Sequence, residues 1–181
     1  MSHVVRHAVA AVTLLVGIPL AGLLAYDVAA VRPRVAGIEA LLAQADPHDA
    51  SPPQIIRDLI DAGAGSPRPH ATRLVVNHVY GTDTSGMLHR HVRELLWRML
   101  LPLHFDDTQL YGLVASQSYN GVDAGLSRFA QREYGKRLDA LSPRQAALTV
   151  AVIHGPSFYL RDRRRLEARA DRLLARAGHG R

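Results

Sequence analysis

Residues 87–103 read MLHRHVRELLWRMLLPL and carry the clearest helical pattern in this chain of 181 residues. Apolar side chains recur there with the 3.6-residue period of an α-helix, which predicts a helix over about 87–101 with one apolar face. Arg90, Glu94 and Arg98 are spaced i, i+4 and i+8 on the other side, and Pro102 ends or kinks the helix. The apolar positions are Leu88, Val92, Leu95, Leu96, Met99 and Leu103.

Helix start and stop signals on both sides of this stretch predict further helices. Ser51-Pro52-Pro53-Gln54 and Ser142-Pro143-Arg144-Gln145 each combine a Ser-x-x-Gln capping box with Pro at the first helical position. Asp123 is placed to cap another helix, and Gly155-Pro156 is a stop signal. Because no run alternates polar and apolar residues as a strand does, we predict an all-α protein.

The N-terminal region has no charged residue between Ala8 and Tyr26. This run just reaches the roughly 20 apolar residues that a helix needs to cross a bilayer. We therefore predict a transmembrane helix, a membrane anchor over residues 1–31. Two alternatives remain open. One is a cleaved signal peptide that has Arg6 in its positively charged n-region and Val28-Ala29-Ala30 as its best cleavage candidate. The other is a buried helix of a soluble domain.

The rest of the chain is long enough for one domain with a modest core. We predict a juxtamembrane helix and linker over residues 32–50, a helical domain over 51–177 and a tail over 178–181. Arg6 and the terminal amine precede the apolar run, and Arg32 and Arg34 follow it, so the positive charges on the two sides are nearly equal. The charge distribution therefore does not choose an orientation in the membrane.

Arginine dominates the charge of this chain. The net charge is +6, and Lys136 is the only lysine. Coding bias in a chain rich in Ala, Arg, Gly and Leu explains this, and so does a partner with phosphate groups, which arginine binds through its planar donor fork. The absence of cysteine excludes disulfides and thiolate sites. The arginine-rich segment 161–177 has almost no aromatic residues, so we predict a solvated helix face and no nucleic-acid partner.

Glu94 is the first candidate for chemistry. It belongs either to a solvated ion-pair face with Arg90 and Arg98, or to a cleft whose cationic neighbours bind phosphate. Metal binding is not predicted, because His89 and His91 do not share a helix face and the chain has no His-Glu-x-x-His motif.

Several of these segments together resemble the peptidoglycan glycosyltransferase domain of glycosyltransferase family 51, found in penicillin-binding proteins and monofunctional transglycosylases. The family's third motif, R-K-x-x-E, is similar to Arg90-His91-Val92-Arg93-Glu94. Its later Leu-Ser helix and Pro-Ser-x-Tyr turn are similar to residues 141–148 and 156–159. Its fifth motif, R-G-x-x-G-x-x-x-A-A-x-x-Y-F-G-K, shares Gly125, Ala130, Tyr134, Gly135 and Lys136 with this chain.

The resemblance implies a single-pass protein of the inner membrane, with a small lysozyme-like all-α domain that faces the periplasm. It implies that Glu94 is a catalytic carboxylate, and that Arg90, Arg98, Lys136 and Gly125 bind the pyrophosphate and sugar of a lipid-linked precursor. No cofactor is expected, apart from an optional divalent cation at the pyrophosphate.

One part of the family's pattern is missing. Its catalytic base, which takes the proton of the acceptor hydroxyl, is a Glu in an E-D-x-x-F-x-x-H segment. We place that segment near residues 61–65, where no Glu occurs, and the chain has none between Glu39 and Glu94. Asp61 is the substitute base if the protein is active.

Three functional hypotheses follow. In the first, the protein is a degenerate family member that acts in cell-wall assembly by binding the lipid-linked precursor, a glycan strand or a cell-wall synthase. In the second, it is a minimal active peptidoglycan glycosyltransferase that uses Glu94 and Asp61. In the third, it is a basic membrane-surface protein with no role in the cell wall.

Overall fold

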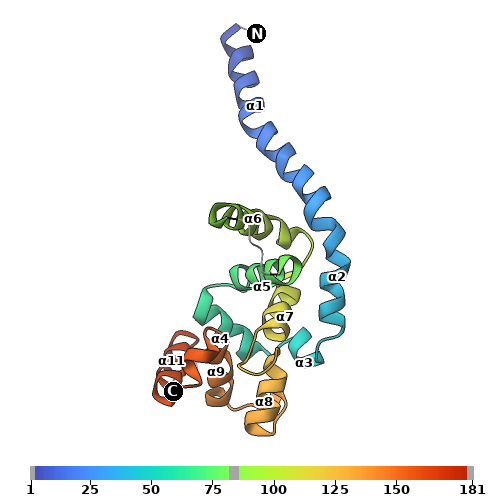
Figure 1. Cartoon of the computed structure of the whole chain (residues 1–181). Coiled ribbons are helices and arrows are strands. Elements are labelled where there is room, and N and C mark those ends of the chain that lie inside the picture. Colours follow the sequence, from blue (N-terminus) through green and yellow to red (C-terminus); the bar gives the residue numbers. More distant parts are fainter. Residues whose placement is uncertain (1–2, 82–85, 179–181) are drawn as a thin grey trace. The chain divides into compact units, whose positions relative to one another are not determined.

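The computed structural model describes residues 3–81 and 86–178, and within them it confirms the all-α prediction (Figure 1). These two ranges contain no strand, and the only β-type pairing in them is an isolated bridge between Tyr119 and Ala124. The predicted tail at 178–181 lies almost wholly outside the described residues. The helices are α1 (His3–Tyr26), α2 (Arg32–Ala43), α3 (Pro47–Ala50), α4 (Gln54–Ala64), α5 (Arg68–Tyr80), α6 (Met87–Leu100), α7 (Asp107–Gln117), α8 (Leu126–Tyr134), α9 (Pro143–Val152), α10 (Pro156–Tyr159) and α11 (Arg163–Arg176).

The chain divides into two units, residues 1–37 and 38–181. In the first unit, α1 continues through a π-helical turn at Asp27–Val31 into α2. The segment Thr13–Ala43 is the one described helix that is long and apolar enough to cross a membrane. Its apolar side chains include Leu14, Leu15, Val16, Ile18, Leu20 and Leu24, all of which are exposed. The predicted apolar N-terminal helix is therefore present, and its surface suits a lipid environment.

The second unit is a helical domain built around α9. Every residue from Ala146 to Val152 is buried, because α4, α8 and α11 pack against this helix (Figure 1). A helix with small and apolar residues on all sides is stable only when it is enclosed in this way. The predicted capping box at its start is confirmed, since Ser142 accepts a hydrogen bond from the backbone N–H of Gln145 and the Gln145 side chain accepts one from the backbone of Ser142.

The segment 38–50, predicted as part of a linker, belongs to the helical domain. Ile38 is buried, and so is Asp49 on α3, which packs against α7. The approach of these two helices requires a glycine at Gly112, where a Cβ atom would collide with the backbone carbonyl oxygen of Ala50. This packing places the acidic residues of the segment next to α8.

Two of the predicted helix caps are wrong. α4 begins at Gln54 and not earlier, so Gln54 cannot close a capping box with Ser51; the Ser51 hydroxyl instead accepts a hydrogen bond from Arg57. α8 begins after Gly125 and not after Asp123. In both cases the side chain that was expected to cap the helix bonds elsewhere, Ser51 to Arg57 and Asp123 to Asn120 and Arg132.

α6 has the predicted apolar face, but most of that face is exposed. Leu88, Val92, Leu95 and Met99 are solvent-accessible, while Trp97 and Leu100 are buried. The buried side of α6 packs on α5, where the ring of Trp97 lies edge-on to Tyr80 with the ring centroids 6.2 Å apart.

Candidate functional site

A cleft between α5 and α6 contains two of the predicted site residues. It encloses about 250 Å³ and is lined by Arg73, Val76, Asn77, Arg90, His91 and Glu94. On α5, Arg73 and Asn77 are four residues apart, as are Arg90 and Glu94 on α6, so each pair lies on one side of its helix. The packing of these two helices brings both pairs into one cleft, which we call the α5–α6 cleft.

The α5–α6 cleft is cationic. Arg73 and Arg90 have no ion-pair partner among residues 3–81 and 86–178, whereas Glu94 lies 3.5 Å from the guanidinium of Arg98. Arg98 therefore offsets the charge of Glu94 from outside the cleft. His91 is held at the cleft by a 2.7 Å contact between its Nδ1 atom and the carbonyl oxygen of Met87. Two guanidinium groups that face one cavity can together bind a phosphate or carboxylate group.

The other predicted site residues lie outside the α5–α6 cleft. Asp61 on α4 accepts a 2.5 Å hydrogen bond from the hydroxyl of Tyr111 on α7, and its Oδ1 atom is buried without a partner in the described part of the chain. Lys136 donates to the side-chain oxygen of Gln145 at 3.2 Å. Asp61 therefore links α4 to α7, and Lys136 bonds to a residue in the first turn of α9. Gly125 belongs to a second region, around Asp49.

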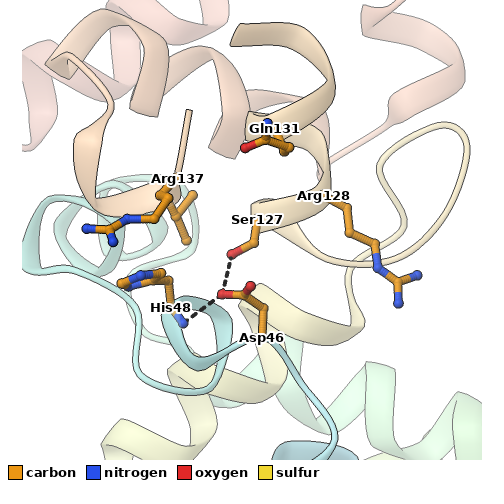
Figure 2. Close-up of a pocket in the computed structure, with 7 residues that line it drawn as sticks. Asp46, His48, Ser127, Arg128, Gln131 and Arg137 are labelled. Atoms are coloured by element: carbon orange, nitrogen blue, oxygen red, sulfur yellow. Dashed lines mark hydrogen bonds between the residues drawn. The ribbon is translucent and has the colours of Figure 1, made fainter. Parts of the chain in front are cut away.

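Asp49 forms the centre of this second region, at the N-terminus of α8. One oxygen of its carboxyl group accepts hydrogen bonds from the backbone N–H of Ser127 at 2.9 Å and from the Ser127 hydroxyl at 3.0 Å. The Ser127 hydroxyl also lies 3.1 Å from Asp46, which caps α3 through the backbone N–H of His48 (Figure 2). α3 thus supplies the cap that α8 lacks in its own sequence.

The surroundings of Asp49 change its acidity. The residue is 3% exposed, and burial raises the pKa of its carboxyl group to about 6, against the opposing effect of the hydrogen bonds from Ser127. The nearby negative charge of Asp46 raises this pKa further. A carboxyl group with a pKa near 6 exchanges its proton close to neutral pH, as a general acid or base must.

Two cavities adjoin this carboxyl pair, and we call them together the α3–α8 site. One of about 380 Å³ is lined by Asp46, His48, Ser127, Arg128, Gln131, Arg137 and Leu138 (Figure 2). Another of about 220 Å³ shares Asp46 and Arg128 with it and is also lined by Asp49. Gly125 has a φ of +108°, and a Cβ atom there would lie 2.9 Å from Asp49. The predicted site residue Gly125 is therefore a close neighbour of a carboxylate that the sequence did not single out.

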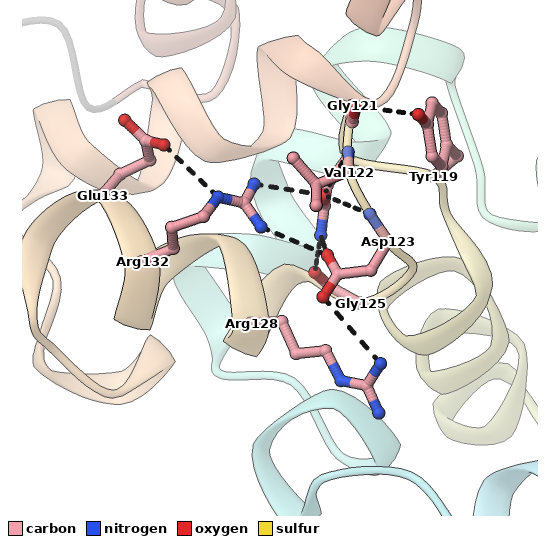
Figure 3. A network of polar contacts seen from close by, with 9 residues as sticks. Tyr119, Gly121, Val122, Asp123, Gly125, Arg128, Arg132 and Glu133 are labelled. Carbon is pink, nitrogen blue, oxygen red and sulfur yellow. Dashed lines mark hydrogen bonds and ion pairs between the residues drawn. The ribbon is translucent and has the colours of Figure 1, made fainter.

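A polar network fixes the turn before α8 (Figure 3). The side-chain amide of the fully buried Asn120 donates to Asp123 at 2.6 Å and to the carbonyl oxygen of Gly125 at 2.9 Å. Arg132 joins Asn120 and Asp123 from α8. Desolvation raises the pKa of Asp123, but the hydrogen bonds from Asn120 and Arg132 outweigh it and lower that pKa overall. This network holds Gly125 in its positive-φ conformation against Asp49.

Two histidines lie close enough to Arg73, which lines the α5–α6 cleft, to feel its charge. The rings of His70 on α5 and His154 at the end of α9 meet edge to face, with the ring centroids 5.7 Å apart. Burial lowers the pKa of His70 to about 4, helped by the positive charge of Arg73 and by His154. Burial also lowers the pKa of His154. Both histidines are therefore neutral at pH 7.

The residues that complete both sites were not predicted from the sequence. The i, i+4 spacing of Arg73 and Asn77 was a detectable signal, since it repeats the pattern of Arg90 and Glu94. Asp49 gave no such signal, because its contact with Ser127 joins residues 78 positions apart in the chain. In the described ranges, no group of three or more His, Asp or Glu side chains could hold a metal ion.

No model of a known protein family, no curated protein and no solved structure matches this chain. The resemblance to glycosyltransferase family 51 therefore stays a prediction.

Proposed function

We propose that this chain is a membrane-anchored protein of glycosyltransferase-51 type that binds the pyrophosphate of a lipid-linked peptidoglycan precursor in its α5–α6 cleft. The observation that carries the proposal is the convergence of Arg73 and Arg90 from two helices on one cavity. In this proposal the domain lies on the periplasmic side of the inner membrane and acts in cell-wall assembly without polymerising glycan.

The chemistry of the cleft supports an anionic head group as the ligand. Arginine binds phosphate oxygens through two parallel N–H donors, and two arginines can hold the two phosphates of a pyrophosphate. Asn77 and His91 add neutral polar atoms at the same cavity. A volume of about 250 Å³ suits a head group rather than a whole precursor, since sites that enclose drug-sized ligands start at about 300 Å³.

The covalent link to an apolar helix supports a lipid as the carrier of that head group. A domain joined to the candidate span Thr13–Ala43 meets membrane lipids at a high local concentration. Among such lipids, the matches to glycosyltransferase family 51 at Arg90 and Glu94 favour the peptidoglycan precursor as the ligand.

Binding is tested with the full chain in lipid nanodiscs and a lipid-linked disaccharide-pentapeptide as the ligand. We expect Arg73→Gln and Arg90→Gln each to weaken binding about tenfold, because each removes a charge-assisted hydrogen bond worth about 1.5 kcal/mol or more. The matched control is Arg164→Gln, which removes an exposed arginine of α11 and should leave the affinity unchanged. Equal affinity in all four proteins would remove the cleft from the proposal.

A second candidate function, an active transferase, is favoured by one observation. Asp49 has a pKa of about 6 and lies against Gly125 and beside Asp46. This carboxyl group is a candidate base that was not predicted from the sequence. Asp61 is the other candidate for that role and is bonded to Tyr111.

Polymerisation of the lipid-linked disaccharide-pentapeptide separates the two functions. Glycan chains that disappear in Glu94→Gln and in Asp49→Asn would support the transferase with Asp49 as its base. Chains that disappear in Asp61→Asn and persist in Asp49→Asn would assign that role to Asp61. No chains from the wild-type protein, together with saturable binding, is the result that the binding proposal expects.

A further inference from the structure

In the described part of the helical domain, the apolar face of α6 and the turn after it carry six exposed large apolar side chains. Leu88, Val92, Leu95 and Met99 recur at intervals of four, three and four residues, so their side chains form one stripe along the helix. Met87 precedes the stripe, and Leu103 follows it in the next turn. The exposed fractions of these six side chains are 71% for Met87, 78% for Leu88, 48% for Val92, 56% for Leu95, 53% for Met99 and 67% for Leu103.

An exposed stripe of large apolar side chains on a packed helix marks a contact surface. Soluble monomers rarely expose a contiguous apolar patch of more than a few hundred Å², and larger patches mark contacts with proteins or membranes. The exposure of the stripe does not result from a poorly packed helix, because Trp97 and Leu100 on the opposite side of α6 are fully buried. The stripe is therefore a surface feature of a helix that is already packed.

We propose that this stripe docks into the bilayer interface, with α6 lying along the membrane surface. The charges of α6 favour lipid as the occupant. Three arginines and a single acidic residue, Glu94, give α6 a formal charge of +2. Arg98 lies beside the stripe, whereas Arg90 lines the α5–α6 cleft and Arg93 stacks on the ring of Tyr80. A helix with a net positive charge and an exposed Leu- and Met-rich face is typical of segments that lie in the interface of an anionic membrane.

The same charge disfavours a second copy of this chain as the occupant. Stripe-to-stripe packing of two α6 helices would bring together two helices that each carry a charge of +2, whereas anionic lipid head groups attract that charge. The candidate span in the same chain keeps a bilayer within reach of the domain at all times. Docking of the stripe does not depend on the ligand of the α5–α6 cleft, so it can hold even if the proposed function fails.

The experiment uses the absence of cysteine in the chain. Leu88→Cys and Leu95→Cys provide single attachment sites for an environment-sensitive fluorophore on the stripe. Val122→Cys is the matched control, because Val122 is an apolar residue that is 70% exposed on the turn before α8. Each full-length labelled variant is reconstituted in vesicles of phosphatidylglycerol and phosphatidylcholine, and helical content and Trp97 emission verify that it is folded.

We expect the two stripe labels to be quenched by lipids that carry a quencher on the acyl chain and to be protected several-fold from iodide in the water phase. The Val122 label should show the reverse. Stripe labels as open to iodide as the Val122 label would overturn the proposal. Stripe labels protected from iodide but untouched by the lipid quencher, with self-quenching that disappears on dilution with unlabelled protein, would assign the stripe to a second copy and also overturn it.

Discussion

The pH dependence of stability should be nearly flat between about pH 4 and 6, because two buried groups oppose each other. The pKa of His70 falls from 6.5 in the unfolded chain to about 4 in the fold, so the unfolded state binds more protons between these values. Stability from this group is complete above pH 6.5 and is lost as the pH falls. At 1.36 kcal/mol per pKa unit the loss is about 3 kcal/mol.

Asp49 has the opposite effect over nearly the same pH range. Its pKa rises from 3.8 in the unfolded chain to about 6 in the fold, so here the folded state binds more protons. The contribution of this carboxyl is largest below pH 3.8, and about 3 kcal/mol is lost as the pH rises through 6. The two effects nearly cancel in the wild-type protein, and the lowered pKa of His154 adds a small residual rise with pH.

The substitution Asp49→Asn should reveal the pH dependence of stability that His70 contributes. Asparagine keeps an oxygen that can accept the N–H of Ser127 but does not titrate, so the stability of the variant should rise by about 3 kcal/mol from pH 4 to 6.5. Urea unfolding of the full chain in detergent micelles measures this at several pH values, with the emission of Trp97, the single and fully buried tryptophan, as the signal. A variant whose pH profile matches that of the wild-type protein would refute the reasoning, because the Asp49 carboxyl would then not titrate in this range.

Three further substitutions test the packing around Asp49. Gly112→Ala should cost about 2 kcal/mol or more in urea unfolding, because its Cβ atom would meet the carbonyl oxygen of Ala50 and push α3 from α7; an unchanged midpoint would contradict this packing. Gly125→Ala should cost about 1–3 kcal/mol by the same measurement, since alanine is strained at a φ of +108° and its Cβ atom would lie 2.9 Å from Asp49. Ser127→Ala should raise the pKa of Asp49 above about 6 in a carboxyl NMR titration, because it removes a hydrogen bond that lowers this pKa; a fall in the pKa would contradict the assignment.

Capping patterns in the local sequence predicted the start of one helix correctly and failed at another. The box of Ser142 and Gln145 is present as predicted, because both partners lie in the first turn of α9. The similar pattern at Ser51 and Gln54 fails because Arg57 binds Ser51 and Gln54 binds Asp58. The period of the apolar face of α6 was predicted correctly, but a period does not reveal whether a face meets protein, lipid or water.

The sites were predictable only in part, for a similar reason. The spacing of Arg90 and Glu94 places them on one face from sequence alone, and both line the α5–α6 cleft. Their partner Arg73 lies on another helix and needs the packing of α5 on α6. Asp49 and Ser127 meet only because α3 packs beside α8, so the buried carboxylate could not be recognised before the fold was known.

The decisive measurement compares the wild-type chain with the double variant Arg73→Gln/Arg90→Gln, both in nanodiscs, for binding of the lipid-linked disaccharide-pentapeptide. The matching polyprenol without phosphate serves as the reference ligand. We predict saturable binding of the pyrophosphate lipid by the wild-type protein, no saturable binding of the polyprenol, and a loss of affinity of tenfold or more in the double variant. Equal binding of the pyrophosphate lipid by the two proteins would contradict the role assigned to the α5–α6 cleft.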